Sequence, residues 1–169
     1  RFALDGKIIS MPEFDGVEDF PSESDNLRQL PFVTRQEFLF ASFDPVDTFE
    51  NFVDDAAMKL KDIEPNGLRL TATREYEINA HWALYCENYL EGFHIPYVHH
   101  GLSEIVDYGS YTTETFRYSS LQTGFDDAGE IAARYLFVFP NLMFNFYLWG
   151  ISVNVVRPVS PSKSLVEFL

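Results

Sequence analysis

The residues best suited to chemistry lie in one short segment near the middle of the chain. Three of the four histidines, His94, His99 and His100, fall within seven residues of one another. Glu91 precedes His94 by three positions and Glu87 precedes Glu91 by four, which is the spacing of side chains on one helix face. Two imidazoles and a carboxylate that leave other coordination positions open suit non-haem Fe(II), and zinc accepts the same ligands.

The helix that would carry these residues is expected to run from about 80 to 93, with Asn79 as its cap. Pro96 should end regular helix, so that a loop could return His99 toward His94. The spacing is also compatible with a simpler interpretation. A histidine at a helix end often contacts only the terminal carbonyls, and two adjacent histidines often lie in a solvated turn. Spacing alone leaves both interpretations open.

Composition limits the classes of protein to consider. The chain has 169 residues, which fits one domain or one domain plus part of another. Its 12 Lys and Arg against 26 Asp and Glu give a net charge of -14, which argues against nucleic-acid and anionic-lipid partners and weakly favours a cationic ligand. Cys86 is the single cysteine, which excludes an internal disulfide and a cluster held by several thiolates. The low cysteine count fits a reducing, cytoplasmic location.

The coarse pattern predicts an α+β fold with an antiparallel sheet and two helices. One helix should begin at Asp44-Pro45, with apolar residues at helical spacing from Phe49 to Leu60. Strands and turns alternate over the rest of the chain. The expected elements are a hairpin at 2–9, strands at 37–43, 68–78 and 111–121, a turn at 126–129, two strands within 135–156 and a last strand after a loop at 158–161.

The segment 135–156 carries no charge, so hydropathy alone would suggest a membrane span. Pro140-Asn141 interrupts it, and Asn145 and Asn154 would lie unpaired in hydrocarbon, so two buried antiparallel strands are favoured instead. Its aromatic residues are candidates for lining an apolar cavity, although most are expected in the sheet core. These candidates are Phe137, Phe139, Phe144, Phe146 and Trp149.

The segment 82–99 resembles the iron-binding signature of Rieske non-haem iron oxygenase terminal (alpha) subunits, the family of ring-hydroxylating dioxygenases and their relatives. That signature is a Glu, three or four residues, an acidic residue, two residues, a His, four or five residues and a second His. The matching positions are Glu87, Glu91, His94 and His99, with Glu91 where Asp is commoner. The sequence at 88–90 and 96–97 is most similar to that of the choline-monooxygenase and quaternary-ammonium branch.

The resemblance implies a role for each matching residue. His94 and His99 would be two ligands of a mononuclear Fe(II), and Asn88 a polar residue beside the metal. Glu91 would orient His94 and link it to the cluster-binding His of a neighbouring subunit. The third ligand, a carboxylate, is expected on a later helix beyond Leu169. His81 is interpreted as a helix-start residue and not as a ligand.

The resemblance also implies a domain plan. Residues 1–43 would be the C-terminal remnant of a Rieske [2Fe–2S] domain, and residues 44–169 the N-terminal part of a helix-grip catalytic domain. The segment 1–7 is similar to the stretch just after the second Cys-x2-His of that domain, and 165–169 reads as an interrupted strand. A piece of a larger subunit, without cluster ligands and inactive alone, is therefore expected.

The implied activity is that of a terminal oxygenase. Electrons from NAD(P)H would pass through a reductase or ferredoxin and the [2Fe–2S] cluster to Fe(II), where dioxygen and a small organic substrate meet. The substrate would be an aromatic ring or a quaternary ammonium compound, and the intact assembly a homotrimer or a trimer with beta subunits. A metal-free helix-grip carrier of an apolar ligand is the alternative, and an interaction protein with solvent-facing histidines is a weaker third.

Overall fold

The computed structural model describes residues 1–35, 38–63, 67–99, 101 and 106–169. They form two compact units, 1–46 and 47–169, and each is described by itself. In the first unit, β1 (Phe32–Arg35) pairs with β2 (Phe38–Ala41) in an antiparallel ladder, and a short 3-10 helix, η1, spans Glu23–Asp25. The strand expected at 37–43 is β2, with position 37 outside the described residues.

The N-terminal hairpin expected at 2–9 is only partly formed. A single antiparallel bridge joins Phe2 to Ile8. Gly6 has a φ of +85°, the left-handed conformation that glycine adopts at little cost, so the chain does reverse at the expected Asp5-Gly6 position. The strands do not extend beyond this bridge.

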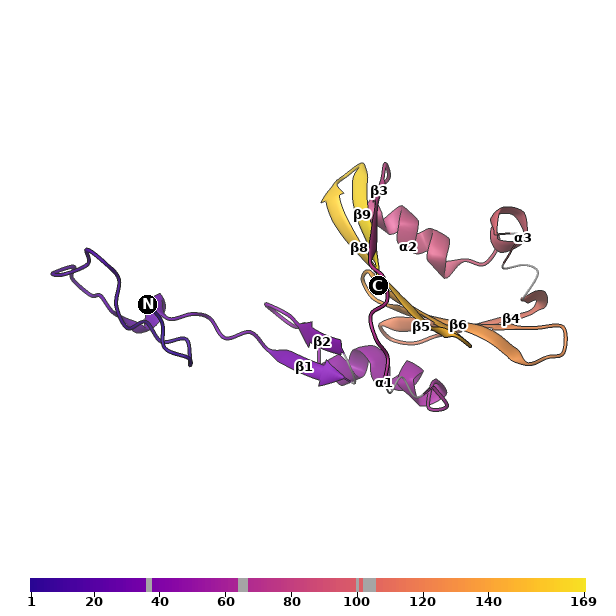
Figure 1. The fold of residues 1–169 in the computed structure, drawn as a ribbon, viewed down its shortest axis with the longest axis horizontal. Coiled ribbons are helices and arrows are strands. Elements are labelled where there is room, and N and C mark those ends of the chain that lie inside the picture. The colour runs from indigo at the N-terminus through magenta and orange to yellow at the C-terminus, as the bar shows by residue number, and fades with distance from the viewer. Residues whose placement is uncertain (36–37, 64–66, 100, 102–105) are drawn as a thin grey trace. The chain divides into compact units, whose positions relative to one another are not determined.

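The second unit is built on an antiparallel sheet, which has seven strands within the described residues (Figure 1). The strand order is β3-β9-β8-β7-β6-β5-β4. Strands β4 to β9 therefore each lie beside the next strand along the chain, whereas β3 pairs with β9 at one edge of the sheet. The strands are β3 (Arg74–Ile78), β4 (Asp107–Thr115), β5 (Ser119–Phe125), β6 (Ile131–Val138), β7 (Leu142–Tyr147), β8 (Gly150–Ser160) and β9 (Lys163–Phe168).

The two longer helices cover opposite faces of this sheet. Helix α1 (Phe49–Lys59) packs on β5 and β6, and α2 (Trp82–Leu90) packs on β8 and β9. Successive strand residues point to opposite faces. On β6, Arg134 bonds to Asp62 just after α1, whereas the next residue, Tyr135, packs edge-on against Tyr89 of α2. Figure 1 shows α1 and α2 on the two sides of the sheet.

Coverage on both faces explains the uncharged run at 135–156. Under α2, the fully buried side chains of Met143, Val156 and Val166 form a core with Cys86. On the other face, residues Leu121, Leu136, Phe144 and Val153 are paired across four neighbouring strands and are all buried. Apolar residues are therefore needed on both faces of these strands. Among the described residues, no helix is long and apolar enough to cross a membrane.

The helix expected from Asp44-Pro45 starts later. Helix α1 begins at Phe49 with Thr48 as its cap residue. Asp47 holds this start, because its carboxylate accepts hydrogen bonds from the Thr48 N–H at 2.9 Å and from the Asn51 side chain at 2.5 Å. The apolar spacing identified the helix correctly, but the local hydrogen bonds of Asp47 fixed its first turn.

Four strand boundaries also differ from the expectation. The strand expected at 68–78 is formed only over β3. The single strand expected at 111–121 is replaced by parts of two strands, β4 and β5. They are joined by a turn in which the Phe116 N–H donates to the Ser119 carbonyl. The run at 135–156 contains parts of three strands, because a second turn at 148–149 follows the expected one near Pro140. Strand β8 continues through Pro158 to Ser160, so the expected loop at 158–161 is shorter.

Candidate metal and substrate site

Helix α2 sets the position of the candidate site and is shorter than expected. His81, not Asn79, is its N-cap, and its Nδ1 accepts a hydrogen bond from the Ala83 N–H at 3.3 Å. The helix ends at Leu90, and Glu91 takes an extended conformation (φ −106°, ψ 143°) as the C-cap. His94 therefore does not extend the α2 face, and the chain turns at Gly92 to place it.

Glu91 and His94 are nevertheless in direct contact. The Oε1 atom of Glu91 lies 2.5 Å from Nδ1 of His94, and its Oε2 atom accepts the Phe93 N–H at 2.6 Å. Partial burial raises the pKa of the Glu91 carboxyl, but these hydrogen bonds outweigh it and lower the pKa overall. An ionised Glu91 favours the tautomer in which His94 donates from Nδ1 and leaves Nε2 with its lone pair.

A short helix, and not the expected loop, connects the two histidines. Helix α3 spans Ile95–Val98, with His94 as its N-cap and His99 as its C-cap. Pro96 is tolerated because the first turn of a helix leaves its N–H groups unpaired. The rings of His94 and His99 meet edge to face, with centroids 5.0 Å apart. The expectation that a loop without regular helix follows at Pro96 was wrong, although the two histidines do come together.

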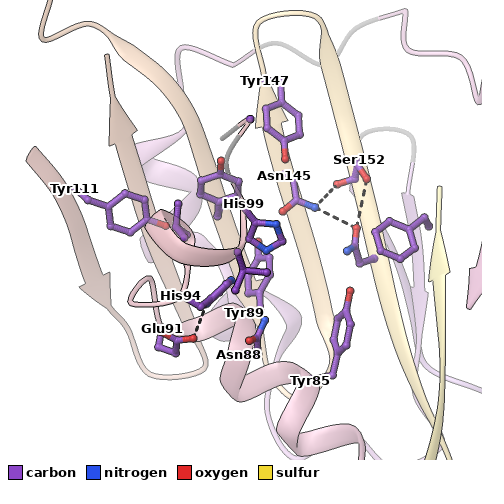
Figure 2. Close-up of a pocket in the computed structure, with 16 residues that line it drawn as sticks. Tyr85, Asn88, Tyr89, Glu91, His94, His99, Tyr111, Asn145, Tyr147 and Ser152 are labelled. Carbon is purple, nitrogen blue, oxygen red and sulfur yellow. Dashed lines mark hydrogen bonds and ion pairs between the residues drawn. The ribbon is translucent and has the colours of Figure 1, made fainter. Parts of the chain in front are cut away.

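Both histidines line a cavity of about 840 Å³ between α2, α3 and the sheet (Figure 2). Its wall is rich in tyrosine and in side-chain amides. The described lining residues include Tyr85, Tyr89, Tyr111, Tyr135, Tyr147, Phe168, Asn88, Asn145, Asn154, Ser152 and Glu91. Lysine and arginine are absent from the described residues of this wall.

The aromatic residues proposed from the sequence do not line this cavity. Phe137 is buried in the core under α2, and Phe144 is buried on the α1 face. Phe139 is exposed, whereas Phe146 and Trp149 border a smaller cavity of about 440 Å³ near Asp62. The tyrosines were missed because strand phase decides which face each residue takes, and the uncharged sequence does not reveal that phase.

Hydrogen bonds fix the polar part of the wall. Gln122 accepts from the Tyr111 hydroxyl at 2.9 Å and donates to the Tyr89 carbonyl at 2.9 Å. Asn145 donates to the Asn154 side chain at 3.1 Å and to the Ser152 carbonyl at 3.2 Å. Figure 2 shows this second network on the sheet side of the cavity. Side chains locked in this way keep the cavity shape defined.

The remaining residues proposed from the sequence fall into different places. Asn88 lines the cavity together with Glu91, His94 and His99. Glu87 is exposed on α2 and is not part of the cavity wall. His100 lies outside the described residues.

The donor set is compatible with the implied metal. His94 has its Nδ1 engaged by a carboxylate, which is the usual arrangement around a metal-binding histidine and leaves Nε2 as the donor. His99 offers a second imidazole nearby. Within the described residues, no group of three or more His, Cys, Asp or Glu side chains converges on one point. The described residues therefore offer two imidazole donors and no complete metal site.

Comparison with known proteins defines the family. Residues 66–168 match the family model described as ring hydroxylating alpha subunit (catalytic domain). The chain belongs to this family of Rieske-type oxygenase alpha subunits, and both the family and the α+β fold class predicted from the sequence are confirmed.

Individual relatives agree with this membership. A chloroplastic choline monooxygenase of Arabidopsis thaliana is 27% identical over 190 residues, covering 99% of this chain and 45% of that protein. The crystal structure of the quaternary ammonium Rieske monooxygenase CntA with an inhibitor aligns with a TM-score of 0.81 and 25% identity, over 99% of this chain and 48% of that chain. The structure of naphthalene 1,2-dioxygenase aligns with a TM-score of 0.76 at 16% identity, over 99% of this chain and 49% of that chain. This alignment shows the shared fold. The chain thus spans about half the length of these proteins.

Proposed function

We propose that this chain forms part of a terminal oxygenase in which His94 and His99 hold a mononuclear iron. The observation that carries the proposal is the contact of Glu91 with His94 Nδ1, beside His99 and in the wall of a large cavity. A metal-free carrier needs no carboxylate-oriented imidazole beside a second imidazole. A mononuclear iron bound there would supply reductive activation of dioxygen, with one or both oxygen atoms entering the substrate.

The chain's own residues have separate tasks in this proposal. Glu91 fixes the ring orientation and tautomer of His94 by accepting its Nδ1 proton. Asn88 presents an amide to the same cavity. The aromatic wall excludes water from the reacting atoms and holds the substrate near the histidines.

The proposal extends to the parts of the protein that must supply electrons. Residues 1–43 are the end of a Rieske [2Fe–2S] domain and residues 44–169 the beginning of the catalytic domain. A reductase or ferredoxin delivers electrons from NAD(P)H, and Glu91 couples His94 to the cluster of a neighbouring subunit in a trimer. A carboxylate later in the full-length protein completes the metal ligands.

For the substrate we propose a small quaternary ammonium compound. Five tyrosines and Phe168 border one cavity, and aromatic faces attract a desolvated cation. The ionised Glu91 adds a negative charge in the same wall. The overall charge of -14 also favours the approach of a cation. The relatives named for choline and for quaternary ammonium oxidation lend support to this choice.

The test is oxygen consumption by the full-length protein with its reductase and NADH. Choline and carnitine serve as quaternary ammonium probes, and naphthalene serves as an aromatic probe. We expect substrate-dependent oxygen uptake with at least one ammonium compound and none with naphthalene. Turnover of naphthalene alone would overturn the substrate class, and tight binding without any oxygen uptake or iron would favour the carrier.

A further inference from the structure

A row of polar side chains crosses the cavity face of the sheet. Tyr135 of β6 is paired with Asn145 of β7, and Asn145 is paired with Ser152 of β8. Gln122 of β5 is paired with Tyr135 on the other side. Residues paired in this way point to the same face, so the row runs across four neighbouring strands. It lies beside the apolar core under α2 and needs its own explanation, because burying polar groups is costly.

Most members of the row satisfy their hydrogen-bonding groups within the protein. Gln122 uses both its oxygen and its nitrogen, and Asn145 donates twice. Ser152 bonds to the Asn154 side chain at 3.3 Å. These residues are therefore part of the scaffold of the wall.

The hydroxyl of Tyr135 is the exception. Tyr135 is only 6% exposed and lines the cavity, and its Oη atom makes no hydrogen bond of normal geometry among the described residues. Its ring is held edge-on between Tyr89 and Tyr147. In addition to burial, a weak hydrogen-bonding interaction with the Tyr147 hydroxyl raises the pKa of Tyr135, but the pair does not meet normal hydrogen-bond geometry. A buried donor without a partner costs free energy, and a ligand that accepts its proton removes that cost.

The ionisation state of this phenol agrees with a donor role. Burial raises the pKa of Tyr135, and the neighbouring hydroxyls of Tyr147 and Tyr111 raise it further. The group is therefore neutral and protonated at physiological pH. The described wall contains the carboxylate of Glu91 and no lysine or arginine, so it does not suit a buried carboxylate in the ligand.

We propose that Tyr135 is a specificity-determining residue that donates a hydrogen bond to a neutral oxygen of the substrate, a hydroxyl or carbonyl oxygen. This inference rests on the proposed function and adds to it. The substrate then carries an oxygen apart from its ammonium group, and a compound lacking that oxygen leaves the Tyr135 hydroxyl unpaired. Sites that hydrogen-bond a polar group of the substrate discriminate against the analogue that lacks this group.

The test compares two probes in the full-length protein. Choline carries the hydroxyl, and ethyltrimethylammonium is the same cation without it. The wild type should bind choline about fivefold to tenfold more tightly by titration calorimetry, as one neutral hydrogen bond provides. Tyr135→Phe should remove this preference by weakening choline binding, and leave ethyltrimethylammonium binding unchanged. Tyr76→Phe, at a half-exposed tyrosine on the edge strand β3, is the matched control and should keep the preference.

The outcomes separate this inference from the proposed function. A preference that survives Tyr135→Phe overturns the role of Tyr135 while leaving the ammonium class intact. If the wild type binds neither compound, this inference is overturned, and oxygen uptake with choline and carnitine decides the proposed ammonium class separately. Thermal unfolding provides a second readout, because removal of an unpaired hydroxyl should not lower the melting temperature. A marked drop in Tyr135→Phe would mean that the hydroxyl is already bonded inside the protein and would contradict the inference.

Discussion

The Glu91 carboxylate, at the C-cap of α2, is hydrogen-bonded to His94, at the N-cap of α3. Its Oε1 atom lies 2.5 Å from His94 Nδ1, and its Oε2 atom is bound by the Phe93 N–H. Both oxygens are therefore engaged, and the histidine ring is fixed at the point where α2 has ended and α3 has not begun. An acidic partner with both oxygens bonded at this junction fixes the orientation of the donor side chain.

Glu91→Gln should weaken metal binding. The amide keeps the size of the side chain but loses the charge that fixes the His94 tautomer. A change of this kind costs about tenfold to a hundredfold in metal affinity. Iron retained by the full-length protein against a competing chelator measures the effect. Glu87→Gln, on an exposed position of α2, is the matched control and should retain wild-type iron. Equal iron loss in both variants would contradict the orienting role.

Met143→Ala should destabilise the catalytic unit. Met143 is fully buried under α2, and truncation of such a residue leaves a cavity that costs about 2–5 kcal/mol. The control is Met58→Ala, because Met58 is 63% exposed on α1 and its loss should cost far less. Urea unfolding followed by circular dichroism gives both values. Similar midpoints for the two variants would show that the core under α2 is not packed as described.

Gly124→Ala should disturb the edge of the cavity. A Cβ atom at this position would lie 2.8 Å from Val106 Cγ1 and 3.6 Å from Tyr111 Cδ2. Because Val106 is buried, the clash needs a backbone or side-chain shift that costs about 1–3 kcal/mol. Gly101→Ala, where a Cβ atom meets none of the described residues within 4 Å, should be close to neutral. Differential scanning fluorimetry distinguishes the two, and an unchanged Gly124→Ala melting temperature would refute the close approach.

The Cys86 thiol should react very slowly in the folded protein. Burial raises its pKa to about 11. Only the thiolate is nucleophilic, so at pH 8 roughly one molecule in a thousand is reactive even before access is considered. Alkylation by iodoacetamide, read at the peptide containing Cys86 by mass spectrometry, should be negligible until denaturant is added. Rapid labelling of the native protein at pH 8 would contradict the buried position of Cys86 at the α2–sheet contact.

Periodicity revealed the element types of this fold better than their ends. The apolar spacing from Phe49 to Leu60 identified α1, but Asp47 decides where it begins. The run at 135–156 was correctly read as buried antiparallel strands, with one turn found at Pro140 and the second, at 148–149, missed. An uncharged run covered on both faces has no alternation from which to count strands.

The residues of the candidate site were also predicted only in part from the sequence. Glu91, His94, His99 and Asn88 were selected from one segment, and they line one cavity because α2 and α3 are local structures. The tyrosine wall comes from distant strands and depends on register, which single-residue patterns do not give. Tyr135, Asn145 and Ser152 become neighbours only through strand pairing. The amino-acid sequence of the 82–99 segment identified the family, which the geometry of two histidines alone left open.

The central claim is tested most directly by the metal content of the full-length protein. Mononuclear iron, quantified per polypeptide and separately from any iron–sulfur cluster, is compared in the wild type and in a His94→Ala/His99→Ala variant. The control is His81→Ala, which removes a helix cap outside the cavity. We predict that the double variant loses the mononuclear iron while the control retains it. Stoichiometric mononuclear iron in the double variant would contradict the account.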